Sequence, residues 1–391
     1  MRRTNHKTLV LALVLLGVMG GVDHAGADKV KTLSVGTWNA NFLPTERGGN
    51  PWWPFSEAIL NAITATDFDV LVLQEVWTEA HRDEIISAVG KKYRYHYAGS
   101  ARNDEPPINC EFDGRHGDLE DRAREYIQCN IQNGINTASL IRPYPNPQPF
   151  ACSVAALDIQ LWGGDPENQQ CLACLINSMQ NLPYNQTAPF DAIPICKGIG
   201  GLFDPPLPLG GPRFTLDGVN GILILSKFPI TEVSETDFNS WLINRKNIYA
   251  TIRKTRFAFV HFGNDAIADL GFPGVETYGD IQIDHANDII AHSPDVVIGD
   301  FNSGPDYQPE GYDTLINAGY RDLVQPQPFA TFCPPSHKDW IQCINDGNVP
   351  KAIDHILVKQ DAPATFTGTF ADGVISLHIG VSATIVPPRG K

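Results

Sequence analysis

Six apolar segments of this chain carry, at or near one end, a polar side chain that can bind a metal or move a proton. These side chains are Asn39, Glu75 with its neighbour Gln74, His261, Asp300 with Asn302, Asp354 and His378. Each one alone is better explained as a cap, a solvent contact or a buried hydrogen-bonding group. Six in one chain favour a shared site instead, because sheets gather ligand sites at the ends of their strands.

The residue types are suited to phosphate chemistry. Glu75 offers a hard carboxylate oxygen and Asn39 a neutral amide oxygen, which together suit Mg²⁺, with Mn²⁺ or Ca²⁺ as alternatives. The two histidines can divide a base role from an acid or oxyanion-stabilising role, and Asp354 can orient one of them. Asn302 can donate to a phosphoryl oxygen without adding charge. The sequence has neither a phosphate-binding Walker loop nor a G-x-S-x-G segment, so a serine nucleophile is not indicated.

Alternating strands and helices are expected to position these side chains. Hydrophobic periodicity predicts strands over 33–43 and 68–77 and helices over 56–65 and 79–89. After a long irregular segment, the pattern resumes with strands at 221–230, 247–253, 255–263, 295–305, 352–359 and 373–386 and a helix at 276–292. This alternation predicts an α/β domain with helices layered over sheet.

The first 27 residues have the pattern of a secretory signal peptide: a basic start, an apolar run and small residues at Ala25 and Ala27. A membrane anchor is the alternative, but the apolar run is shorter than the ~20 residues of a spanning helix. We therefore expect residues 28–391 to form a secreted or periplasmic protein. The net charge of −15 disfavours a nucleic-acid partner, which normally meets a basic face.

The irregular segment at about 100–218 is rich in proline, glycine and cysteine and holds six of the eight cysteines. An even number of cysteines in an exported chain favours structural disulfides over metal binding. The Cys171–Cys174 spacing lacks the second close pair that a zinc site needs. We expect a disulfide-rich insertion whose pairing the sequence leaves open, while Cys333 and Cys343 can close a later loop.

Seven short motifs occur in an order that resembles the endonuclease/exonuclease/phosphatase superfamily. They are "TWNAN", "DVLVLQEVW", "NGILILSKFPI", "FVHFG", "IGDFNSGP", "AIDHILV" and "SLHIGVSAT", spread over about residues 31–98 and 219–387. The resemblance implies a four-layer α/β sandwich, with two packed mixed β-sheets and helices on the outer faces. It also implies a metal-dependent phosphoric diester hydrolase in which water attacks phosphorus directly.

The resemblance also implies roles for single residues. Glu75 would be the principal Mg²⁺ ligand, with Asn39 beside it. His378 would be the base that activates water, oriented by Asp354, and His261 would stabilise the phosphoryl oxygens.

Three further positions carry over in the same way. Asp300 and Asn302 would lie by the phosphate, with Asn302 as a donor, and Asn220 would line the cleft. One position departs from the family pattern: the family's S-D-H motif reads Ser376-Leu377-His378 here. Leucine binds no metal, so this site has one carboxylate fewer than the family pattern.

The motifs look closest to secreted neutral sphingomyelinase-like enzymes. The expected substrate is therefore a phosphodiester, most simply a lipid headgroup at a membrane surface, and no stable protein partner is expected. A secreted nuclease or other phosphoesterase is one alternative, and a non-catalytic binding protein on the same fold is another.

Overall fold

The computed structural model describes nine segments of the chain, and the statements below concern these alone. They are residues 32–42, 56–76, 79–100, 219–238, 245–263, 277–325, 329–335, 349–372 and 376–388. The predicted signal peptide and the cysteine-rich insertion lie outside them and stay predictions. Of the eight cysteines, the described segments contain only Cys333, so the disulfide framework also stays a prediction.

Within these segments the strands form two mixed sheets. The first has the order β11-β12-β1-β2-β4-β3. Its strands are β1 (Leu33–Phe42), β2 (Val70–Val76), β3 (Tyr95–Ser100), β4 (Val219–Ser226), β11 (Ala364–Phe370) and β12 (Gly380–Ile385). β1 and β2 are parallel, and the other neighbours are antiparallel.

The second sheet has the order β5-β6-β7-β8-β10-β9. Its strands are β5 (Ile230–Phe238), β6 (Arg245–Ile252), β7 (Thr255–His261), β8 (Val296–Asp300), β9 (Tyr320–Asp322) and β10 (Asp354–Lys359). β7 and β8 form its parallel pair. Each sheet therefore has one parallel pair near its centre, flanked by antiparallel strands.

The two sheets pack face to face through alternate residues of their strands. One apolar cluster joins Leu33 and Val35 of β1 to Phe257 and Phe259 of β7, with matching positions from β2, β4, β6, β8, β10 and β12. Successive strand residues point to opposite faces, so the remaining apolar positions face outward.

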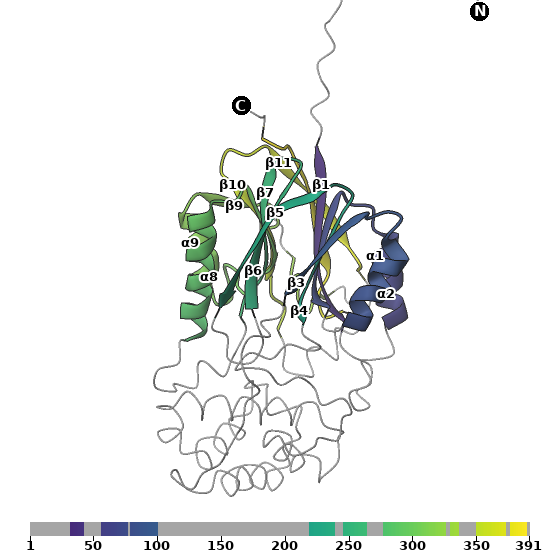
Figure 1. Cartoon of the computed structure of the whole chain (residues 1–391). Coiled ribbons are helices and arrows are strands. Elements are labelled where there is room, and N and C mark those ends of the chain that lie inside the picture. The colour runs from purple at the N-terminus through teal and green to yellow at the C-terminus, as the bar shows by residue number, and fades with distance from the viewer. Residues whose placement is uncertain are drawn as a thin grey trace, which may run out of the picture. The chain divides into compact units, whose positions relative to one another are not determined.

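Helices cover both outer faces (Figure 1). Helices α1 (Ser56–Ala65) and α2 (Glu79–Val89) pack on β1, β2 and β4, and α8 (Tyr278–His292) and α9 (Glu310–Asn317) pack on β6, β7, β8 and β10. The expected four-layer α/β sandwich is confirmed. No helix in the described segments is long and apolar enough to cross a membrane.

The predicted elements differ from the structure mainly at the sheet edges. The strand expected over 221–230 corresponds to β4, which ends at Ser226; the chain bends at residues 227–229, and the expected strand includes only the first residue of β5. The edge strands β3, β9 and β11, nearly all of β5 and the short helix α9 were not predicted. In β11 every residue is exposed or only half-buried, so it lacks the apolar run that marks a central strand. The strand expected over 373–386 begins only at Gly380, so His378 precedes it.

Candidate active site

Strand alternation and topology bring most of the predicted site residues to one edge of the sandwich. Asn39, His261 and Asp300 lie near the ends of β1, β7 and β8. Each is an even number of residues from the apolar residues of its strand that face the other sheet, so its side chain points to that side as well. Asn220 and Asp354 lie at the starts of β4 and β10, and alternation along these strands points both side chains toward the other sheet. Because those two strands run antiparallel to β2 and β8, their starts meet the same edge.

Glu75 reaches the site by breaking the alternation. Leu71 and Leu73 of β2 pack under the helices, and strict alternation would place Glu75 with them. Its φ of 61° lies in the left-handed region, and the register of β1 on β2 shifts at the same point, between Asn39 and Phe42. This bulge turns the Glu75 carboxylate inward, where Oε1 accepts from Asn39 Nδ2 at 3.0 Å.

Two carboxylates converge on the Asn39 amide. Asn39 Nδ2 also donates to Asp300 Oδ2 at 2.8 Å, so one amide nitrogen lies between the two acids. His261 Nε2 lies 3.6 Å from Asp300 Oδ2 and 3.9 Å from Glu75 Oε1. Asn39, His261 and Asp300 are each about 1% exposed. The structure thus assembles four predicted residues into one buried polar cluster.

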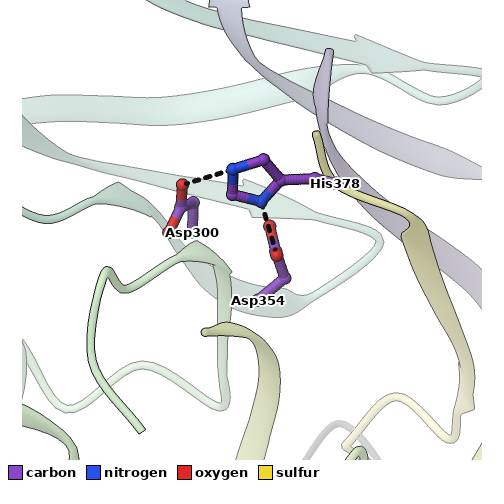
Figure 2. A group of neighbouring side chains, drawn as sticks. All are labelled: Asp300, Asp354 and His378. Atoms are coloured by element: carbon purple, nitrogen blue, oxygen red, sulfur yellow. Dashed lines mark hydrogen bonds and ion pairs between the residues drawn. The ribbon is translucent and has the colours of Figure 1, made fainter. Parts of the chain in front are cut away.

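His378 and Asp354 form the second part of the cluster (Figure 2). His378 Nδ1 lies 2.8 Å from Asp354 Oδ2, and His378 Nε2 lies 3.9 Å from Asp300 Oδ2. A carboxylate can only accept, so Nδ1 carries a proton and donates it to Asp354. The imidazole is held at one nitrogen and presents the other to the Asp300 side.

Side chains and backbone of β1 hold the His378 segment in place. Trp38 Nε1 donates to the His378 carbonyl at 3.1 Å, and Ser376 Oγ donates to the Asn39 carbonyl at 2.6 Å. The backbone N–H of His378 donates in turn to Ser376 Oγ. Leu377 is half-buried between these two anchored residues, and its carbonyl accepts from the backbone of Cys333.

The surrounding charges control protonation in the cluster. Burial lowers the pKa of His378, but the charge and hydrogen bond of Asp354, with the charges of Asp300 and Glu75, outweigh burial and raise that pKa to about 9. Burial and the nearby Asp354 charge raise the pKa of Asp300 to about 6. A base must be unprotonated to act. Positive charge beside Asp300 and Glu75 would therefore favour the basic form of His378.

The donor set fits a hard divalent cation. Glu75 Oε1 and Asp300 Oδ2 approach a common point, and carboxylate oxygens are what Mg²⁺ prefers. Asn39 currently directs its N–H to that point, while its Oδ1 accepts from the backbone of Asn41, so its role as a ligand stays a prediction. Asp300, Asp354 and His378 also offer ligand atoms within 4.8 Å of one another. The Asp354–His378 hydrogen bond is compatible with the expected role of that pair in proton transfer, which stays a prediction.

Two predicted residues lie beside the cluster. Asn302 has a φ of 47°, which ends the alternation, and its Nδ2 donates to the Phe262 carbonyl at 3.1 Å. Its backbone N–H donates to Asp300 Oδ1, so Asn302 braces the loop that holds Asp300. Asn220 is buried and packs so tightly on Gly99 that a Cβ there would lie 2.9 Å from its Oδ1. Direct contact of either residue with substrate stays a prediction.

Sequence reasoning missed two cations near the site. Arg245, which begins β6, is 1% exposed, and its Nη1 lies 2.6 Å from His261 Nδ1. Lys351 Nζ lies 3.6 Å from the centre of the Tyr307 ring and 5.5 Å from that of Phe332. Burial lowers the pKa of Lys351 to about 8, against the opposing charge of Asp300. The available signals were a basic residue at the start of β6 and another three residues before β10.

The comparison with known families agrees with this geometry. The sequence model of the Endonuclease/Exonuclease/phosphatase family matches residues 36–378, and the chain belongs to that family. The family unites nucleases with phosphatases, which hydrolyse phosphate esters. The resemblance drawn from the motifs is confirmed.

Several solved structures are similar in fold. Sphingomyelinase C from Streptomyces griseocarneus is 13% identical, with 91% of this chain and 99% of that chain covered and a TM-score of 0.47. A beta toxin variant from Staphylococcus aureus with bound magnesium ions is 14% identical, with 90% and 99% covered and a TM-score of 0.46. Truncated TDP2 from Caenorhabditis elegans is 13% identical, with 91% and 97% covered and a TM-score of 0.42. No curated protein sequence matches the chain. At these scores the similarities carry no argument about substrate.

Proposed function

We propose that this chain is a metal-dependent phosphodiesterase in which His378 activates the attacking water. The observation that carries the proposal is the buried Asp354–His378 pair. Its 2.8 Å hydrogen bond fixes the proton on Nδ1, so the other ring nitrogen can accept a proton at the carboxylate cluster. A positioned base of this kind contributes roughly 10²- to 10⁴-fold to a rate.

The proposed reaction is a single displacement at phosphorus. The water oxygen forms a bond to phosphorus while the bond to the leaving alcohol's oxygen breaks, and the water proton passes to His378 Nε2. Asp354 stabilises the imidazolium that results, and the departing oxygen takes up a proton from solvent water to leave as an alcohol. Mg²⁺, when bound by Glu75 and Asp300, supplies positive charge beside the phosphate. His261 lies across the same cluster, where its Nε2 can donate to a phosphoryl oxygen.

A lipid headgroup is the substrate class we favour. The chain carries a net charge of −15, which opposes close approach of a polyanion such as duplex DNA. The nearby cations are local: Arg245 is buried behind His261, and Lys351 is held over aromatic rings. This distribution suits a single phosphate better than a long charged backbone. The predicted signal peptide supports a secreted or periplasmic enzyme that meets such lipids at a membrane surface.

A non-catalytic binding protein is the second candidate, and Leu377 is the observation that favours it. The position directly before His378 lacks the carboxylate that the family motif carries. The remaining cluster is nevertheless intact and hydrogen-bonded, with Glu75, Asp300, Asp354 and both histidines in place. We therefore favour the enzyme.

A substrate panel tests this proposal. Purified protein would be assayed on sphingomyelin vesicles, phosphoinositide vesicles and plasmid DNA, each with Mg²⁺ and with a chelator. We expect release of phosphocholine from sphingomyelin in Mg²⁺ and none with the chelator. Cleavage of DNA alone would support the nuclease alternative. Absence of hydrolysis on every substrate would support the binding protein.

A further inference from the structure

The Arg245–His261 contact determines which nitrogen of His261 carries a proton. Arg245 Nη1 lies 2.6 Å from His261 Nδ1, and both side chains are about 1% exposed. A guanidinium has five N–H donors, no acceptor, and does not lose its proton in proteins. His261 Nδ1 must therefore accept this hydrogen bond through its lone pair.

The tautomer follows from this geometry. With Nδ1 unprotonated, the neutral imidazole carries its one proton on Nε2. That nitrogen is the one directed at the cluster, 3.6 Å from Asp300 Oδ2 and 3.9 Å from Glu75 Oε1. Both distances exceed a hydrogen bond, so the carboxylates attract the N–H without engaging it closely.

We propose that Arg245 is a positioning residue that locks His261 as a neutral Nε2–H donor facing the reacting phosphate. The proposal rests on the proposed function and adds to it a division of labour between the two histidines. His378 donates from Nδ1 to Asp354 and is the base, whereas His261 accepts at Nδ1 from Arg245 and is the donor.

The charge of Arg245 also affects how strongly His261 donates a hydrogen bond. The guanidinium lies against one nitrogen of the ring and the acidic pair lies near the other. A cation that donates to Nδ1 withdraws electron density from the imidazole, which makes the Nε2–H a stronger donor. Burial excludes water that would otherwise weaken this polarisation.

The direct test is nitrogen NMR of the His261 ring in the full-length protein. The signals of His261, identified by their loss in His261→Gln, should show a protonated Nε2 and an unprotonated Nδ1 in the wild type. A protonated Nδ1 in the wild type would overturn the proposal. This readout needs no substrate, so it can fail or succeed independently of the phosphodiesterase proposal.

Variants of Arg245 then link the tautomer to function. Arg245→Met should mix the two tautomers and lower kcat about 10- to 100-fold, with KM changed less than threefold. Complete loss of one transition-state donor costs roughly 10²- to 10³-fold, and the mixture keeps part of the donor form. Arg245→Lys, which keeps a charged donor, should recover part of the wild-type tautomer preference and part of the wild-type kcat. Arg256→Met is the matched control, since Arg256 is exposed at the opposite end of β7. If Arg245→Met keeps the wild-type tautomer and still loses activity, Arg245 acts only through packing.

Discussion

At the scale of single residues, the site depends on uncommon backbone conformations. Glu75, Asn41 and Asn302 all have positive φ, at 61°, 48° and 47°. Asparagine tolerates this region well, but for glutamate it is unfavourable by on the order of 1 kcal/mol. That cost is the consequence of turning Glu75 from the helix-covered face to the carboxylate cluster. The position of the Glu75 carboxylate thus depends on a local irregularity that strand periodicity alone does not predict.

Leu377 can be changed to restore the missing carboxylate. Leu377→Asp should tighten Mg²⁺ binding several-fold, because added ligand charge raises cation affinity. The measurement is the Mg²⁺ concentration that gives half-maximal activity. Leu377→Asn is the matched control, since it has the shape of aspartate without its charge. Equal Mg²⁺ dependence in Leu377→Asp and wild type would show that this side chain does not face the metal.

At the scale of elements, the site depends on how closely β7 and β8 approach. Gly299 lies between Ile298 and Asp300 with a φ of 154°, and a Cβ there would lie 2.0 Å from the Val260 carbonyl oxygen. No side chain fits at that distance. The glycine therefore lets the parallel pair close, with His261 and Asp300 in register at its end.

Gly299→Ala should separate the two strands. We expect the free energy of unfolding to fall by more than about 2 kcal/mol and activity to be lost, because both backbone strain and a clash are introduced. Gly319→Ala is the matched control: Gly319 also has positive φ (94°), but a Cβ there would meet nothing within 4 Å. It should cost only about 1 kcal/mol. Chemical denaturation measures both, and equal losses would contradict the packing argument.

A buried histidine links β9, β10 and the loop after β8. His355 Nδ1 lies 2.7 Å from Asp322 Oδ2, and Nε2 lies 2.9 Å from the Ser303 carbonyl oxygen. Both partners are acceptors, so both ring nitrogens donate and the ring is an imidazolium. Burial lowers the pKa of His355, but the charge and hydrogen bond of Asp322 outweigh it and raise that pKa above its ordinary value.

This pair predicts a pH dependence of stability. Because the folded pKa is raised, the contribution of His355 is complete below the unfolded pKa of about 6.5 and is lost as pH rises toward the folded pKa. The stability difference between wild type and His355→Gln should therefore be constant at low pH. Above about pH 6.5 it should shrink by up to about 1.4 kcal/mol per pH unit. Denaturation of both proteins from acid to alkaline pH measures it, and a difference that grows with pH would contradict the charged pair.

At the scale of the whole molecule, the central elements were predictable and the edges were not. The helices α1, α2 and α8 and most central strands carry strong apolar periodicity, and their ends were predicted to within about five residues. The central strand β12 is the exception, because it begins at Gly380 and was expected from 373. Nearly all residues of the edge strands β5 and β11 are exposed or half-buried, so neither strand has the run of buried apolar residues that marks a central strand.

The candidate site shows the same limit. The inward direction of His261, Asp300 and Asp354 follows from alternation along predicted strands. The direction of Glu75 depends on a bulge, and the contact of Arg245 with His261 depends on how β6 pairs with β7. Contacts between strands depend on register, which one sequence does not specify.

The proposed hydrolysis of a phosphodiester depends on the Asp354–His378 pair. The most direct measurement compares Mg²⁺-dependent hydrolysis of sphingomyelin by wild type, His378→Ala and His96→Ala, where His96 is an exposed residue of β3. We expect His378→Ala to lower kcat by roughly 10²- to 10⁴-fold while His96→Ala matches the wild type. Wild-type activity in His378→Ala would show that His378 is not the base.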